Sequence, residues 1–107
     1  MSPSASEDSA PEEHAVLLEW EDGEPPLDFI LAVEDRLMEV VDSQPGIGEV
    51  DGNEVGSDTA TIYLYGPDCE HLWSAIEPTV RGLEPTPTRV TIRPGGPDTP
   101  GRDLTLR

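Results

Sequence analysis

The chain has 107 residues, with 23 acidic side chains against six basic ones, all of them Arg, and a formal net charge of −17. Hydrophobic residues make up 35% of it and aromatic residues 5%, which suits one modest core in one domain. The apolar runs are far shorter than the roughly 18 residues of a membrane span, so we expect no membrane-spanning segment.

The negative charge narrows the range of possible partners. From His14 onward the chain carries 19 acids and six Arg, so the charge is not confined to a tail. Such a field repels phosphate backbones and anionic lipids, and we expect neither nucleic acid nor membrane as a partner. Two explanations of the acidity stay open. It keeps a small protein soluble, or it adapts the surface to concentrated salt, as in a halophile, where charges are screened.

The single cysteine and the N-terminus bear on the compartment. One Cys excludes a disulfide framework within the chain. Residues 1–13 have neither the basic start nor the apolar centre of a secretory signal, so a cytoplasmic location is expected. Residues 1–12, rich in Ser, Pro, Ala and acids, are predicted to form a disordered acidic tail, and residues 13–107 a single α+β domain.

The first two elements follow from apolar patterning. Ala15–Trp20 is apolar on both faces, which predicts a central strand. Pro25 and Pro26 suit the first turn of a helix of about 17 residues that ends near Gln44 to Gly46. The apolar side of this helix consists of Leu27, Ile30, Val33, Leu37, Val40 and Val41. Its opposite, solvent-facing side consists of Asp28, Glu34, Asp35, Glu39 and Asp42.

Two strands are expected in the middle of the chain. Residues 47–56 contain three Gly at four-residue spacing, typical of an irregular edge strand with a bulge or turn. Residues 59–65 alternate, with Ala60, Ile62 and Leu64 facing one side of the sheet and Thr61, Tyr63 and Tyr65 the other.

A second helix and two short strands complete the pattern. Asp68 suits the N-cap of a helix whose apolar side chains extend to Leu83, and Pro78 predicts a kink or a break within it. Residues 88–93 alternate as a strand, and residues 103–106 suggest a last short one. The order predicts an α+β fold, a ferredoxin-like split β-α-β-β-α-β sandwich. Its antiparallel sheet would carry two helices on one face, plus a short C-terminal strand.

Two segments carry a resemblance to known proteins. The segment GEVDGNEVG at residues 48–56, followed by IYLYGPD at residues 62–68, resembles a group of small uncharacterised prokaryotic α+β proteins. The resemblance covers about residues 46–93 and implies the same fold. It assigns no activity and no catalytic residue.

Few residues suggest chemistry. Asp51, Asn53, Glu54 and Asp58 cluster in a Gly-rich segment and are weak metal-ligand candidates. Ile62 stands where a calcium loop starting at Asp51 needs its bidentate Glu, and a hairpin with exposed acids explains the cluster better. Cys69, in a first helical turn beside two acids, is expected to be a half-buried structural thiol. No catalytic residue and no cofactor is predicted.

The pair Tyr63 and Tyr65 is the more interesting feature. If Ala60, Ile62 and Leu64 pack under the helices, the two tyrosines project from the open face of the sheet, where Glu19 of the first strand could join them. They either pack on cross-strand neighbours or form a protein-contact surface, in which Tyr is enriched.

These observations favour a non-catalytic binding or regulatory protein. The first hypothesis is an interaction module that uses the open sheet face to bind a protein partner or to form a homodimer. The second is an acidic inhibitor or immunity-type protein that covers the basic site of a partner. The third is a small-ligand or metal-binding domain that uses residues 48–58.

Overall fold

The computed structural model describes residues 14–21, 26–56, 58–95 and 101–106. These ranges contain the strands and helices β1 (His14–Trp20), α2 (Leu27–Asp42), β2 (Glu49–Val55), β3 (Ala60–Gly66), α3 (Cys69–Arg81), β4 (Arg89–Arg93) and β5 (Arg102–Thr105). The α+β class and the predicted order of elements are confirmed. The tail predicted for residues 1–12 lies outside the described residues.

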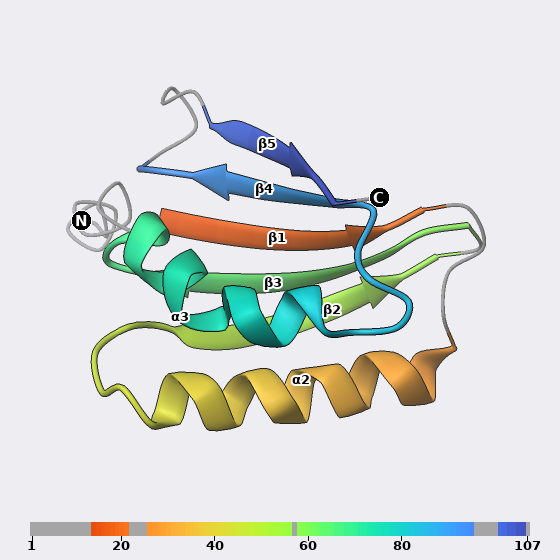
Figure 1. Cartoon of the computed structure of the whole chain (residues 1–107), viewed down its shortest axis with the longest axis horizontal. Helices are drawn as coiled ribbons and strands as arrows, with labels where there is room; N and C mark the ends of the chain where they lie inside the picture. Colours follow the sequence, from red (N-terminus) through yellow and green to blue (C-terminus); the bar gives the residue numbers. More distant parts are fainter. Residues whose placement is uncertain (1–13, 22–25, 57, 96–100, 107) are drawn as a thin grey trace, which may run out of the picture.

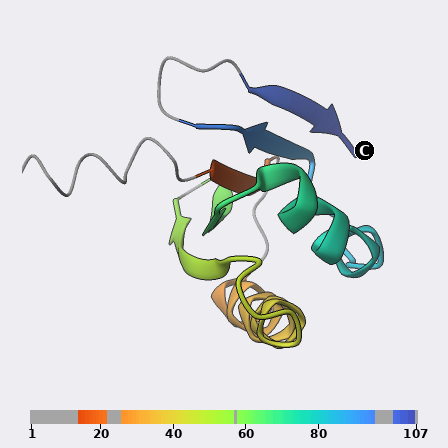
Figure 2. The same ribbon diagram turned by 90° about the vertical axis from the view of Figure 1, so that its left-hand side faces the viewer.

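The strands form one antiparallel sheet in the order β2-β3-β1-β4-β5 (Figure 1). Strand β1 is central, as its two apolar faces predicted, and β2 lies at one edge. Helix α2 packs against β2 and α3, whereas α3 packs against β1 and β4. Figure 2 shows both helices on the same side of the curved sheet.

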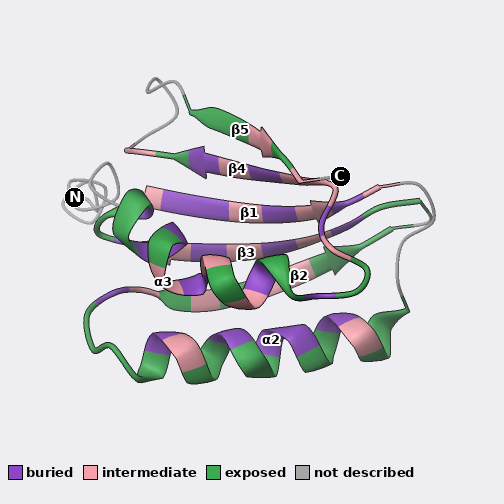
Figure 3. Cartoon of the chain, in the orientation of Figure 1, coloured by how far each residue is buried: buried purple, intermediate pink, exposed green. Residues whose placement is uncertain are grey.

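The core lies between that side of the sheet and the two helices. Strand β3 confirms the predicted alternation, since Ala60, Ile62 and Leu64 are fully buried while the residues between them are partly exposed. In Figure 3 the buried segments of the sheet concentrate in β1, β3 and β4, and the edge strands are more exposed. The core-facing side chains of the three inner strands and two helices are Val16, Leu18, Trp20, Ile30, Val33, Leu37, Val41, Ala60, Ile62, Leu64, Leu72, Trp73, Ile76, Val80, Val90 and Ile92.

Helix α2 begins at Leu27, directly after Pro26, and departs from the predicted pattern at two residues. Leu27 was predicted on the apolar side but is 50% exposed, because its position in the first turn places it on a flank of the helix rather than over the core. Glu34 was expected on the solvent side, but it is only 7% exposed. It lies four residues after Ile30 and three before Leu37, so helical geometry places it beside the buried stripe. Its Oε2 has no hydrogen-bond partner among the described residues. The solvent-side prediction was therefore wrong for Glu34.

Helix α3 confirms its predicted cap, and of the kink or break predicted at Pro78 it excludes the break. The Asp68 carboxylate accepts hydrogen bonds from the backbone N–H groups of Glu70 (3.0 Å) and His71 (3.2 Å). The helix runs without a break from Cys69 to Arg81 through Pro78. Pro78 removes only one helical hydrogen bond, and Ile76 and Val80, buried on either side of it, hold both halves of the helix on the core.

The strand boundaries differ from the predicted ones by one or two residues, the larger difference being at the start of β2, which begins at Glu49 rather than at residue 47. Strand β4 begins at Arg89 rather than at residue 88, and β5 spans Arg102–Thr105 rather than residues 103–106. The bulge predicted in the edge strand is present in β2, where the pairing with β3 shifts between Val50 and Gly52. No helix in the described part of the chain is long and apolar enough to cross a membrane.

Candidate binding surface

The sheet face opposite the helices, called the open face here, is covered by no described helix or strand. Strand pairing places its side chains in rows that cross the sheet. One row runs from Glu49 through Tyr65 and Ala15 to Arg93. The next runs through Tyr63, Leu17, Thr91 and Asp103, and the third through Glu54, Thr61, Glu19, Arg89 and Thr105.

The two tyrosines occupy the positions predicted for them. Both project from the open face of β3 and are partly buried. Tyr63 lies opposite Leu17 of β1, and Tyr65 lies opposite Ala15, a small residue that is only 6% exposed. The tyrosines therefore pack on cross-strand neighbours, and they also leave ring surface exposed to solvent. The two interpretations of this pair are compatible.

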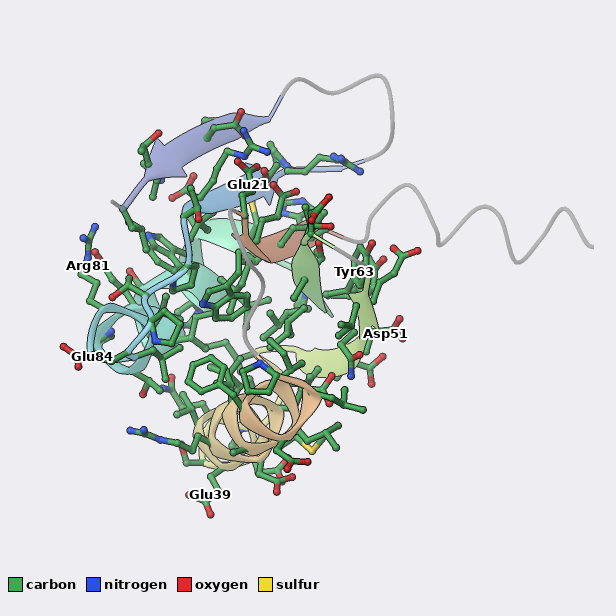
Figure 4. The ribbon with its side chains drawn as sticks, turned by 90° about the vertical axis from the view of Figure 1, so that its right-hand side faces the viewer. Glu21, Glu39, Asp51, Tyr63, Arg81 and Glu84 are labelled. Atoms are coloured by element: carbon green, nitrogen blue, oxygen red, sulfur yellow. The ribbon has the colours of Figure 1, made fainter. Side chains whose placement is uncertain are left out.

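A shallow, open depression of about 510 Å³ lies over the same part of the sheet. It is lined by Tyr63 and Tyr65 of β3 and by residues 51–54 of β2, which include the bulge. Figure 4 shows Tyr63 and Asp51 on the same side of the molecule, away from Arg81 and Glu84. The bulge thus brings the backbone and acids of an edge strand beside two aromatic rings.

The Tyr63 hydroxyl donates a hydrogen bond of 2.7 Å to Oε1 of Glu54. This bond, together with partial burial and the negative charge of Glu54, raises the pKa of Tyr63 above its ordinary value of 10.0. The bond also holds the phenol ring toward the edge strand. One wall of the depression is therefore a positioned tyrosine with a carboxylate at its tip.

Glu19 lies on the open face, as predicted, but in an ion pair. The Arg89 guanidinium donates to Glu19 Oε1 from Nε (3.0 Å) and Nη2 (2.6 Å), and from Nη2 to Glu21 Oε2 (2.7 Å). These carboxylates raise the pKa of Arg89. The charge of Glu19 is therefore largely compensated, and the described acids of the open face that form no ion pair lie on the two edge strands, on β2 and at Asp103 of β5.

The four weak metal-ligand candidates do not form one site. Asp51, Asn53 and Glu54 line the depression, and Asp58 is not among its lining residues. No group of three His, Cys, Asp or Glu side chains in the described ranges is close enough to hold a metal ion. The structure brings three of the candidates beside the two tyrosines, so residues 51–54 belong to the same surface.

Cys69 is more deeply buried than expected, at 1% exposure. Burial and then the neighbouring charges of Glu70 and Asp68 raise the pKa of its thiol, which suppresses the thiolate that a nucleophile needs. Its backbone N–H donates to Nδ1 of His14 (2.9 Å), so a residue 55 positions away adds a second cap to α3. The structural interpretation of this cysteine suits its surroundings.

Sequence analysis missed two contributors to the open face. Leu17 lies beside Tyr63, and Arg89 neutralises Glu19. The signal for Leu17 was present, because the side chains of β1 must alternate between the two faces. The partner of Glu19 depends on which strand lies beside β1, and local pattern does not carry that information.

Comparison with known proteins adds no further assignment. No family model, no curated protein and no solved structure matches the chain. The function is therefore argued from the fold and the surface alone.

Proposed function

We propose that this chain is a non-catalytic protein-binding module that docks its partner on the open face. The observation that carries the proposal is the pair of partly exposed tyrosines, Tyr63 and Tyr65, beside a depression on a sheet face that no described element covers. Tyrosine is enriched at protein interfaces, where it provides a large contact area with a polar tip.

The charge of the open face favours a basic partner over a second copy of the chain. Strand β2 adds Glu49, Asp51 and Glu54 to the rim, and among the described residues the ion pairs on this face involve only Glu19, Glu21 and Arg89. Two acidic copies would repel each other at low salt, whereas a basic partner would be attracted during encounter. A homodimer through this face remains the alternative for concentrated salt, where screening weakens the repulsion.

The same charge supports a second candidate, an acidic inhibitor or immunity-type protein that covers the basic site of its partner. The observation in its favour is the net charge of −17 combined with an acidic rim around an aromatic centre. This candidate uses the same residues and differs only in what happens to the partner. If the partner is an enzyme, its activity should fall on binding.

The proposal extends to fold and compartment. We infer a ferredoxin-like topology with β5 added at one edge, supported by the 2-3-1-4 order of the first four strands and their antiparallel pairing. The resemblance of residues 46–93 to small prokaryotic α+β proteins implies the same fold. A cytoplasmic location suits the unpaired thiol of Cys69.

The test replaces both tyrosines. Tyr63→Ser with Tyr65→Ser should leave the circular dichroism spectrum unchanged and abolish binding of a partner recovered from the source cells and then purified. Ala32→Ser with Ser74→Ala, two exposed helix positions outside the open face, is the matched control. Sedimentation velocity at two salt concentrations measures self-association of each variant. Unchanged binding after loss of both tyrosines would refute the proposal.

A further inference from the structure

The strongly exposed apolar side chains of the described residues gather at one edge of the molecule. Leu27, Leu31 and Met38 of α2 are 50%, 45% and 41% exposed, and Val55 at the end of β2 is 38% exposed. These are the large hydrophobic residues that the described part of the chain leaves in solvent. Helix α2 packs on β2, which is an edge strand, so all four belong to the side of the molecule where the sheet ends.

The three α2 residues form one stripe, called the apolar stripe here. Leu27, Leu31 and Met38 follow at spacings that place them on one flank of the helix. Phe29 lies on the other flank, where its ring meets Trp20 of the central strand edge-on, with centroids 6.0 Å apart. That second flank faces α3 and the sheet centre, so the apolar stripe faces outward beyond β2.

Strand β2 presents an open backbone edge beside the apolar stripe. It pairs with β3 on one side, and no described strand pairs with its other side. Val55 lies opposite the buried Ala60, so it points to the helix-covered side of the sheet. Figure 1 places the end of β2 and the start of α2 at the same end of the molecule, which brings Val55 and Leu27 to that end.

The other side of the same strand is acidic. Glu49 lies opposite Tyr65, and Glu54 lies opposite Thr61, so both carboxylates project on the open face. Asp51, in the bulge, lines the depression there. The β2 edge therefore has carboxylates on the open-face side, and on the helix side Val50 and Val55 with Asn53 between them. Backbone N–H and C=O groups lie between the two sides.

We infer that the β2 edge binds an extended segment of a partner protein as an added strand. Side chains alternate between the two faces of a strand, so a bound segment would point every second residue toward the acids and the others toward the apolar stripe. The segment that fits has Lys or Arg at the first set of positions and apolar residues at the second. The surface adjoins the tyrosines, and the inference does not depend on them.

A second copy of this chain fits the edge poorly. Pairing β2 with another β2 would bring the carboxylates of Glu49, Asp51 and Glu54 close to their counterparts, and like charges opposite each other destabilise a strand pair. Charge complementarity thus selects a basic segment. Acids on an edge strand also discourage edge-to-edge self-association of a protein that keeps such an edge open.

The experiment titrates the full chain with two peptides of about ten residues, a common strand length. The first alternates Lys and Val, and the second has the same composition with the Lys and Val in separate blocks. The backbone amide NMR signals of residues 49–55 should shift when the alternating peptide is added. This peptide should bind about ten-fold more tightly than the peptide with Lys and Val in separate blocks. Methylation of its backbone nitrogens on the side facing β2 should abolish this preference. Equal affinity for the two peptides would overturn the inference, because charge alone would then explain binding.

Variants of the chain separate this surface from the open face. Leu31→Ser with Met38→Ser should weaken binding of the alternating peptide about ten-fold. Ala32→Ser, at an exposed position of the same helix outside the apolar stripe, should leave the affinity for the alternating peptide unchanged. Tyr63→Ser with Tyr65→Ser should also leave the preference for the alternating peptide unchanged. This result would keep the test distinct from that of the proposed function. Unchanged binding after loss of the stripe would overturn the inference. So would self-association of the free chain that protects the β2 amides, because a second copy would then occupy the edge.

Discussion

Tyr63 and Glu54 show how a single contact defines the candidate surface. The phenol donates to the carboxylate, and an ionised Tyr63 would lose this bond and stand beside a negative charge. The raised pKa means that the folded state holds the phenolic proton more tightly than the unfolded state. The resulting stabilisation is fully present below the pKa of an unfolded tyrosine and is lost as pH rises through the higher pKa of folded Tyr63.

Replacement of Glu54 tests this contact. In a Tyr65→Phe background, which leaves Tyr63 as the only tyrosine, Glu54→Gln should lower the pKa of Tyr63, because it removes the main cause of the shift. The ultraviolet absorbance of tyrosinate, followed against pH, gives the titration midpoint. Glu49→Gln, on the same strand without a bond to Tyr63, is the control. A midpoint that does not change with Glu54→Gln would show that the bond is absent in solution.

Glu34 leads to a second prediction at the residue scale. Burial of a carboxylate oxygen without a partner is unfavourable, so Glu34→Gln should raise the free energy of unfolding by about 1 kcal/mol. Asp35→Asn removes the same charge from an exposed neighbour and measures the effect of charge alone. Urea denaturation of both variants gives the comparison. Equal gains would mean that the burial of Glu34 carries no penalty.

At the scale of elements, the end of β3 lies in close contact with the backbone that leads into β2. A Cβ placed on Gly66, the last residue of β3, would clash with the carbonyl oxygen of Ile47. No side chain fits at that crossing. By contrast, a Cβ on Gly52 in the bulge would meet no atom within 4 Å, so the bulge itself does not require glycine for space.

These two glycines form a matched pair of substitutions in adjoining strands. Gly66→Ala should lower the free energy of unfolding by about 1–3 kcal/mol, because the backbone must shift to admit the methyl group. Gly52→Ala should change it by less than about 0.5 kcal/mol. Thermal or urea denaturation measures both. Similar stabilities of the two variants would contradict the close packing at Gly66.

Helix α3 shows that caps from distant segments and packing can outweigh a local signal. Asp68 caps the helix locally, and His14 from β1 accepts the next free N–H, that of Cys69. At the other end Pro78 lacks an N–H, but the buried Ile76 and Val80 keep the helix on the core. Trp20 Nε1 donates a hydrogen bond of 2.8 Å to the carbonyl oxygen of Pro85, which anchors the segment after α3 to β1.

For the whole molecule, the dominant physical feature is the excess of acids. Among the described residues, ion pairs join Arg81, Arg89 and Arg102 to four Glu, and the other described acids are in no such pair. On α2, Asp35 and Glu39 stand four residues apart, and each such like-charge pair destabilises a helix by about 0.2–0.5 kcal/mol. Several such repulsions are significant against a total stability of about 5–15 kcal/mol.

We therefore expect the melting temperature to rise as NaCl increases from dilute to molar concentration. Screening weakens the repulsion among the acids more than it weakens the few exposed ion pairs. Calorimetry across this range measures the effect. Sodium sulfate is the control, because it also strengthens hydrophobic burial. A flat melting temperature in NaCl would leave the acids as solubility groups and contradict adaptation to salt.

The sequence by itself determined the features that depend on local pattern. Hydrophobic spacing predicted α2, strict alternation predicted the two faces of β3, and one carboxylate predicted the cap of α3. These predictions succeeded because periodicity and capping involve residues a few positions apart. The same alternation placed Tyr63 and Tyr65 on the open face before any strand order was known.

Only the tertiary structure decided what lies beside each face. Periodicity does not say which neighbour covers the flanks of a helix, so it missed the burial of Glu34 and the exposure of Leu27. Nor does it specify the strand order that pairs Glu19 with Arg89, 70 residues away. The β2 edge and the open face arise from this packing, because a surface belongs to elements that meet in space rather than in sequence.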